Sequence, residues 1–299
     1  MLQTRLLVGT LLAILGVGLL VFDAYLEPWY PFLLIVVVGL GMLGTYELLS
    51  LLHPSWRPLA MICYPAVCCV LAVNWIDPLR PYLGPAGLWL GGRDAWSLIL
   101  WVFVAVVIVA FLVEMYRYRK PGVSVVRIAL TVWVVTYLGL LPTFLAQLRW
   151  LEPTSLGLGG STSSAISRST LALAIAIFVP KSCDIGAYFT GRWFGRHQMS
   201  PTLSPKKTWE GAAGGIVCAV LSTVGICRLG LDLPGGLIAE MVLGALLGGA
   251  GILGDLAESL IKRDSQQKDA GKLLPGFGGV LDVVDSILFA APVAYWWLR

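Results

Sequence analysis

Apolar residues dominate this chain in long runs, and the pattern predicts a helical membrane protein. Each run is about 17–25 residues long, enough to cross the hydrocarbon core of a bilayer as an α-helix. The strands of an outer-membrane barrel would instead alternate apolar and polar residues. We therefore expect an all-α polytopic membrane protein with about nine transmembrane helices, at residues 6–22, 31–52, 59–76, 97–115, 125–147, 170–190, 210–230, 237–257 and 280–298.

Three of these runs have features that bear on the assignment. Pro65 interrupts the third span, and Pro180, Lys181 and Asp184 interrupt the sixth. Prolines and charges are tolerated inside a span where protein or water satisfies the freed polar groups. The first run resembles a signal peptide, but it is long for one and no small-x-small cleavage site follows. We interpret it as a span.

Composition supports a membrane protein and excludes an ordinary soluble domain. Of the 299 residues, 58% are hydrophobic and 13% are charged, whereas soluble domains carry about 25% charged residues. The six cysteines show neither metal-binding nor disulfide spacing. Five of them fall in apolar segments, where cysteine is usually a small core residue.

The distribution of lysine and arginine predicts how the chain crosses the membrane. Loops that face the cytoplasm carry an excess of these residues. The loops after the second, fourth, sixth and eighth spans carry that excess, which predicts a cytoplasmic N-terminus and, in a bacterium, insertion in the inner membrane. A polar segment at 152–170 divides residues 1–150, with about five spans, from residues 170–299, with about four. The basic residues are Arg57, Arg117, Arg119, Lys120, Arg192, Arg196, Lys206, Lys207, Lys262, Arg263, Lys268 and Lys272.

Two pairs of acids lie at predicted span ends on the cytoplasmic side. Asp255 and Glu258 are three residues apart at the end of the eighth span, and Asp282 and Asp285 are three apart at the start of the ninth. Residues at this spacing share a helix face. Such oxygen clusters suit Mg²⁺, which bridges carboxylates to substrate phosphates. The alternative is that each acid pairs with a nearby lysine or arginine. We favour metal binding for Asp255 and Asp282, and weigh both interpretations equally for Glu258 and Asp285.

The segment 203–211 has the outline of a phosphate site. Ser204 and Pro205 open a turn, and Thr208 can cap the helix that follows. Lys206 and Lys207 stand beside that helix N-terminus, where backbone donors and the helix dipole favour anions. The alternative is a basic loop that touches lipid head groups. The basic residues near Asp255 can similarly hold a triphosphate or a lipid head group, or serve only to set topology.

Three motifs resemble the phosphatidate cytidylyltransferases, also called CDP-diacylglycerol synthases. The resemblance covers about residues 178–289, and the first half of the chain shares only its hydrophobic character. Phe277 stands where the family has histidine, and Val283 where it has arginine. The matching residues are D-x-x-A-Y-x-x-G-R-x-x-G at 184–195, S-P-K-K-T-x-E-G at 204–211, and Ser259, Lys262, Arg263, Lys268, Asp269, Pro275, Gly276, Gly278, Gly279, Asp282 and Asp285.

The resemblance implies an Mg²⁺-dependent enzyme that joins CTP to phosphatidate and releases pyrophosphate, with K⁺ as a candidate second ion. It implies that residues 170–299 form the catalytic part and residues 1–150 the scaffold. Membrane lipids are the expected surroundings, a homodimer is a candidate assembly, and no nucleic-acid partner is expected. The implied catalytic residues are Asp255, Asp282, Lys262 and Arg263; the metal ligands are Asp255, Asp282, Glu258 and Asp285; and the substrate-binding residues are Asp184, Ser204, Lys206, Lys207, Thr208, Glu210, Lys268 and Asp269.

Two alternatives remain open from the sequence. A CTP-dependent polyprenol or phytol kinase would share the membrane setting and the nucleotide, but it would release CDP instead of pyrophosphate. The second alternative is a catalytically inactive, lipid-binding homologue. The replacements at Phe277 and Val283 are the features that favour it.

Overall fold

A computed structural model describes residues 2–84, 94–119, 121–151, 166–267, 270–271 and 278–299. The helices are α1 (Leu2–Ala24), α2 (Pro31–Leu51), α3 (Ala60–Ala72), α4 (Ile76–Leu79), α6 (Ala95–Arg117), α7 (Ser124–Val135), α8 (Leu141–Gln147), α9 (Arg168–Phe194), α10 (Trp209–Cys227), α11 (Gly236–Asp264) and α12 (Leu281–Leu298). Short 3₁₀ turns η1 (Val73–Trp75), η2 (Arg80–Tyr82) and η4 (Leu148–Trp150) extend the helices, and a π-helical turn, η3 (Thr136–Leu140), joins α7 to α8.

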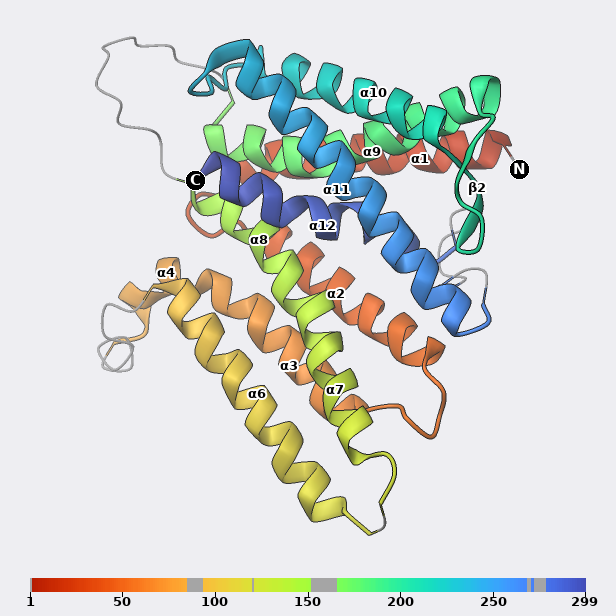
Figure 1. Cartoon of the computed structure of the whole chain (residues 1–299). Coiled ribbons are helices and arrows are strands. Elements are labelled where there is room, and N and C mark those ends of the chain that lie inside the picture. The colour runs from red at the N-terminus through yellow and green to blue at the C-terminus, as the bar shows by residue number, and fades with distance from the viewer. Residues whose placement is uncertain (1, 85–93, 120, 152–165, 268–269, 272–277) are drawn as a thin grey trace.

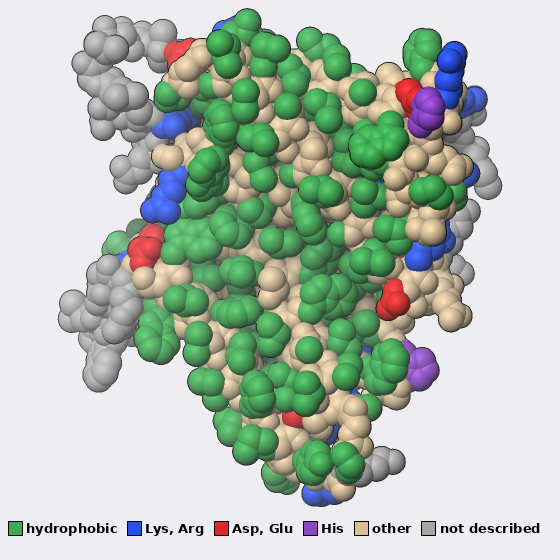
Figure 2. All heavy atoms as spheres, in the orientation of Figure 1, with side chains coloured by type: hydrophobic (Ala, Val, Ile, Leu, Met, Phe, Trp, Pro, Cys, Tyr) green, Lys and Arg blue, Asp and Glu red, His purple; other side chains and the backbone are tan. Residues whose placement is uncertain are grey.

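Eight segments of the described chain are long and apolar enough to cross a membrane. They coincide with the second to ninth expected spans. The first expected span coincides with α1, whose apolar stretch, Gly9–Ala24, is shorter than the other eight segments. Figure 2 shows hydrophobic side chains over most of the visible face, with charged side chains gathered toward its two ends. The prediction of an all-α polytopic membrane protein is therefore confirmed.

The helices pack in two groups that α2 and α8 connect. Helices α9, α10, α11 and α12 pack on one another, while α3, α6 and α7 pack together in the first half of the chain. Both α2 and α8 contact α12. In Figure 1 the β hairpin and the turn between α11 and α12 lie at the same end of the bundle as the N-terminus, and the C-terminus lies at the opposite end. We call the end with the hairpin the charged end.

Helix α11 approaches its neighbours through glycines. A Cβ atom on Gly244 would lie 2.7 Å from the Cα atom of Val220 on α10, and one on Gly254 would meet the backbone carbonyl oxygen of Asp285 on α12. Backbones this close require residues without side chains. These glycines let α11 pack closely on α10 and α12, and the contact at Gly254 brings the neighbouring Asp255 toward α12.

The structure differs from the sequence-based expectations at two places. Helix α9 is continuous through Pro180, and α3 is continuous through Pro65, so neither proline breaks its span. The segment before α10 forms an antiparallel hairpin of β1 (Gln198–Ser200) and β2 (Ser204–Thr208). The predicted turn at Ser204 and Pro205 was wrong, because Ser204 pairs with Ser200 and the turn falls at residues 201–203.

We expect Gly254→Ala to destabilise the protein. The added methyl group would press on a backbone carbonyl that cannot rotate away, and such overpacking costs about 1–3 kcal/mol. Gly249→Ala, on the same helix, is the matched control. A Cβ atom at this position would have no described neighbour within 4 Å. Thermal unfolding of both variants in detergent tests this, and equal melting temperatures would show that the close contact at Gly254 is unimportant.

Candidate active site

Three carboxylates from two neighbouring helices converge at the charged end of the bundle. Asp255 and Glu258 lie one turn apart on α11, and Asp285 lies on α12. One oxygen of each lies within 4.8 Å of the others. Glu258 and Asp285 are buried, and Asp255 is half-buried. We call these three residues the acid cluster; it takes Asp255 and Glu258 from one of the acid pairs and Asp285, without Asp282, from the other.

Each member of the acid cluster has a lysine partner from a different part of the fold. Lys207 of β2 places its Nζ atom 2.7 Å from Asp255 Oδ2. Lys262 of α11 lies 2.6 Å from Glu258 Oε2. Lys181 of α9 lies 3.2 Å from Asp285 Oδ1. The alternative interpretation, in which the acids form ion pairs, therefore holds for all three acids in the structure.

The lysines do not balance the acids completely. Lys181 is shared with Asp184 at 3.2 Å, and Lys262 is shared with Asp282 at 2.6 Å. These eight side chains hold five carboxylates and three ammonium groups, so negative charges exceed positive ones by two. Like charges this close and this far from water repel strongly. A divalent cation would restore the balance.

A further observation favours a bound ion or ligand at this place. The Oε1 atom of Glu258 is buried and, among the residues that the structure describes, has no hydrogen-bond partner. Buried carboxylate oxygens normally accept hydrogen bonds, and a group left without one calls for an explanation. The donor set consists of carboxylate oxygens alone, which are the ligands that Mg²⁺ and similar hard cations prefer. The residues present therefore fit a divalent cation.

Asp282 holds a different position from its predicted partner Asp255. Its Oδ1 atom contacts Lys262, while Oδ2 accepts hydrogen bonds from the backbone N–H groups of Ala270 at 3.1 Å and Gly279 at 2.7 Å. In this arrangement Asp282 fastens the turn before α12 to the start of the helix. Its role as a metal ligand stays a prediction, and the structure brings Asp255 together with Glu258 and Asp285 instead.

Asp184 and Ser286 join α9 to α12 beside the acid cluster. The hydroxyl group of Ser286 donates to Asp184 Oδ2 at 3.0 Å. Lys181 reaches the same oxygen of Asp184. This contact places the predicted substrate residue Asp184 near Asp285. Helix α9 therefore contributes both a cation, Lys181, and an anion, Asp184.

The hairpin brings the second predicted motif to the site. Thr208 is the N-cap of α10, as predicted, because its hydroxyl oxygen accepts the N–H of Gly211 at 3.1 Å. Lys207 points to Asp255, whereas Lys206 is exposed and Ser204 is half-buried. The Lys207 Nζ atom makes this ion pair without a well-aligned hydrogen bond. Its N–H groups are therefore available to a ligand.

Two other predicted residues support the hairpin rather than the acid cluster. Arg263 donates from Nε to the carbonyl oxygen of Leu203 at 3.2 Å, which ties the end of α11 to the hairpin turn. Glu210 accepts the backbone N–H groups of Arg196 and His197 at 3.1 and 3.2 Å. Lys268, Asp269 and Phe277 lie outside the described residues, and Val283 lies half-buried in the first turn of α12.

Sequence reasoning missed Tyr137 as a site residue. It lies on the π-helical turn η3, and its ring is 6.5 Å from that of Phe289, one turn beyond Asp285 on α12. Its hydroxyl group is buried and has no hydrogen-bond partner among the described residues. In the sequence it was one aromatic residue within an apolar run. The π turn that presents it was not visible there, although such turns are frequent at functional sites.

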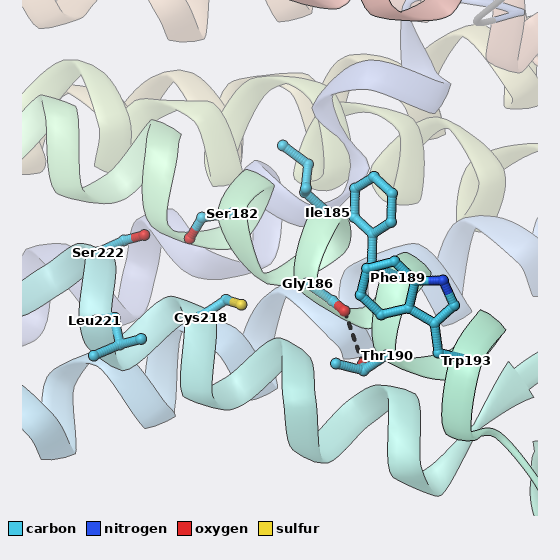
Figure 3. Close-up of a pocket in the computed structure, with 9 residues that line it drawn as sticks. All are labelled: Ser182, Ile185, Gly186, Phe189, Thr190, Trp193, Cys218, Leu221 and Ser222. Atoms are coloured by element: carbon cyan, nitrogen blue, oxygen red, sulfur yellow. Dashed lines mark hydrogen bonds between the residues drawn. The ribbon is translucent and has the colours of Figure 1, made fainter. Parts of the chain in front are cut away.

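An apolar groove between α9 and α10 is separate from this site (Figure 3). Its volume is about 550 Å³, and no lysine, arginine or carboxylate lines it. Ile185, Phe189 and Leu221 are among the lining residues. Lys181 and Asp184 lie on the same helix as Ile185 and Phe189 but do not line the groove. No residue of the acid cluster and none of its lysine partners lines it.

Comparison with known sequences identifies the family. Residues 3–299 match the profile of the family described as "Cytidylyltransferase family". The chain belongs to the cytidylyltransferase family. The resemblance inferred from the motifs at 184–195, 204–211 and 259–285 is thus confirmed, and the family match also takes in the first half of the chain, where only hydrophobic character had been recognised.

Individual relatives align over part of the chain. The phosphatidate cytidylyltransferase of Synechocystis is 46% identical over 118 residues, 39% of this chain and 39% of the relative. The Brucella suis phosphatidate cytidylyltransferase is 47% identical over 114 residues, 38% and 42% of the two chains. Phosphatidate cytidylyltransferase 5 of Arabidopsis is 34% identical over 184 residues, 58% and 45%. The chain thus spans less than half the length of these curated relatives.

We expect the acid cluster to bind a divalent cation in purified protein. Electron paramagnetic resonance of added Mn²⁺ measures this binding without any substrate. Asp285→Asn should weaken it about tenfold or more, because the variant removes one anionic ligand from the site. Asp264→Asn is the control, since Asp264 is an exposed acid at the end of the same α11. Equal Mn²⁺ affinity in both variants would exclude Asp285 as a ligand.

Proposed function

We propose that this protein is a CTP:phosphatidate cytidylyltransferase, which makes CDP-diacylglycerol and pyrophosphate for phospholipid synthesis. The observation that carries the proposal is the acid cluster with its three lysines at the end of an apolar helical bundle. Such a site can gather a metal ion and several phosphates beside a membrane. The family match and the names of the aligned relatives support this reaction over others.

The membrane setting accounts for how two unlike substrates could meet. Phosphatidate keeps its acyl chains in the bilayer, whereas CTP is dissolved in water. The charged end of the bundle provides a place where a lipid head group and a nucleotide can both reach the same residues. The excess of lysine and arginine in the loops of that end supports a cytoplasmic orientation, where CTP is available.

The proposed reaction is an in-line phosphoryl substitution. A phosphate oxygen of phosphatidate forms a bond to the α-phosphorus of CTP, and the bond from that phosphorus to the oxygen bridging the β-phosphate breaks. Pyrophosphate leaves with the bonding electrons. Because the attacking phosphate is already an anion near neutral pH, no strong general base is required. The protein acts by positioning the substrates and by stabilising negative charge.

The lysines are the groups that would contact the phosphates. Lys207 is best placed for this role, because its Nζ atom faces the acid cluster and makes no hydrogen bond of its own. Lys181 and Lys262 approach from two other helices. Cations on three sides would orient a chain of phosphates and hold two anionic substrates together. Arg263 and Thr208 would fix the hairpin that carries Lys207.

Asp255, Glu258 and Asp285 would hold Mg²⁺, with Asp282 as a further proposed ligand and K⁺ as a proposed companion ion. When bound, Mg²⁺ neutralises charge on the nucleotide phosphates and on the departing pyrophosphate. The protein's own contribution is to keep the three carboxylates within 4.8 Å of one another. In this proposal residues 170–299 supply the charged groups, and residues 1–150 support them.

Asp282→Asn should nearly abolish conversion of labelled CTP and phosphatidate in the presence of Mg²⁺. The variant loses the ion pair with Lys262 and weakens the acceptor of two backbone N–H groups. Lipid extraction followed by chromatography measures the labelled lipid product. Turnover at the wild-type rate would exclude an essential role for Asp282.

The same assay separates the proposed reaction from its alternatives. Release of pyrophosphate with a cytidine-labelled lipid supports the cytidylyltransferase. Release of CDP with a polyprenol or phytol acceptor would identify a lipid kinase instead. Absence of any product from wild-type protein that binds phosphatidate would favour an inactive homologue.

Tyr137→Phe should impair turnover while leaving the fold unchanged. We propose that the Tyr137 hydroxyl group donates a hydrogen bond to a substrate phosphate. It has no partner among the described residues, so removing it breaks no contact that the structure shows. A hydrogen bond to a charged phosphate is worth about 1.5–3 kcal/mol, which corresponds to an increase of about tenfold or more in KM. Tyr295→Phe is the contrasting control, because the Tyr295 hydroxyl accepts a hydrogen bond from Trp96 at 2.7 Å.

The control variant should lose thermal stability and keep its KM. The two measurements together separate a ligand contact from a structural one. An unchanged KM in Tyr137→Phe would contradict the proposed contact with substrate.

A further inference from the structure

Glu47 is a buried acid near the C-terminal end of the apolar helix α2, far in sequence from the charged site. Its exposed fraction is 1%. Among the described residues no lysine, arginine or histidine forms an ion pair with it. An isolated buried carboxylate is strongly unfavourable unless other groups stabilise its charge. The contacts of Glu47 show what provides that stabilisation.

Both carboxylate oxygens of Glu47 accept hydrogen bonds from the start of α12. Oε1 accepts the backbone N–H of Val280, and Oε2 accepts that of Leu281, each at 2.9 Å. The first N–H groups of a helix have no partner within the helix, and the helix dipole attracts negative charge there. Val280, the residue at the N-cap position, provides no side-chain cap. Glu47 therefore caps α12 from a different helix.

The turn before α12 is shaped to receive this carboxylate. A Cβ atom on Gly279 would lie 2.6 Å from Glu47 Oε1, and one on Gly271 would lie 2.8 Å from Glu47 Cδ. Both distances are too short for a real Cβ atom, so only glycine leaves room for the Glu47 side chain at these two positions. The two glycines and the two hydrogen bonds fix the position of the turn on α2.

The same turn is bound from its other side by a site residue. Asp282 Oδ2 accepts the N–H of Gly279 at 2.7 Å, immediately before Val280 and Leu281, which bond to Glu47. Asp285 follows Leu281 by one helical turn. The position of Asp285 relative to Asp255 and Glu258 thus depends on where the first turn of α12 is held, and Glu47 holds it.

We propose that Glu47 is a positioning residue for the divalent-cation site, and so links the first half of the chain to the reaction. The role in turnover rests on the proposed function, whereas the role in cation binding can be tested without it. Glu47 touches neither the acid cluster nor the lysines. It sets the distance between the carboxylates of α11 and α12 by anchoring the N-terminus of α12 to α2.

The test is Glu47→Gln in the full-length protein in detergent, with Mn²⁺ binding followed by electron paramagnetic resonance. Glutamine has nearly the same shape, but its NH₂ group would face one of the two backbone N–H donors. We expect Mn²⁺ binding to weaken about tenfold, within the range seen when a group supporting metal ligands is lost. Turnover should require a correspondingly higher Mg²⁺ concentration, and kcat at saturating Mg²⁺ should largely recover.

Glu114→Gln is the matched control, because Glu114 is another buried acid of the first half, on α6, which packs against α3 and α7. Its Mn²⁺ affinity should equal that of the wild type. A purely structural role for Glu47 would reduce the amount of folded protein without changing the Mn²⁺ affinity of the folded fraction, and that result would overturn the proposal.

Glu47→Asp is a second variant, which tests the proposal if Glu47→Gln does not fold. It keeps the charge but shortens the side chain, so that it withdraws from α12, and it too should weaken Mn²⁺ binding. If neither variant yields folded protein, Glu47 is required for the fold itself and the positioning role is wrong. If wild-type protein binds Mn²⁺ but transfers no cytidylyl group, the proposed function is wrong. The positioning role of Glu47 is then still tested by comparing the Mn²⁺ affinities of the wild type and the Glu47 variants.

Discussion

The concentration of charge inside an apolar bundle is the constraint on which the rest of this structure depends. At the charged end, five carboxylates form ion pairs with three lysines. Away from water, such groups are tolerable only when each has partners. The partners come from α9, β2, α11 and α12, so these elements must all be in place before the charges are compensated. The charges are therefore compensated only when the site is assembled.

Close packing is the means by which the charges are brought together. Gly254 lets α11 lie against the backbone of α12, and this contact carries Asp255 and Glu258 toward Asp285. At the N-terminus of α12, where Val280 provides no side-chain cap, the Glu47 carboxylate accepts two backbone N–H groups. Helix α2, in the first half of the chain, thus helps to hold the start of α12, the helix that carries Asp285.

The sequence predicts most of the fold because membrane helices follow from length and apolarity alone. It also singles out the three acids of the cluster together with Lys207 and Lys262, because charges at span ends are rare, but it does not single out Lys181 as a site residue. It does not show that Asp282 binds a backbone turn while Asp285 joins the cluster, because both lie on the first turns of α12 and only the tertiary contacts distinguish them. Glu47 was visible as a single acid in an apolar run, but its partner is more than 200 residues away. The hairpin was missed because its strands are only three and five residues long.

The ion pair between Lys181 and Asp184 has a consequence for how the protein enters the membrane. Helices are inserted in chain order, so α9 reaches the bilayer before α12 has been synthesised. At that stage Asp285, the later partner of Lys181, does not yet exist. Asp184 lies three residues from Lys181 on the same helix and is 3.2 Å away, so α9 carries its own counter-ion through the translocation machinery. The arrival of α12 then adds Asp285 as a second partner for Lys181.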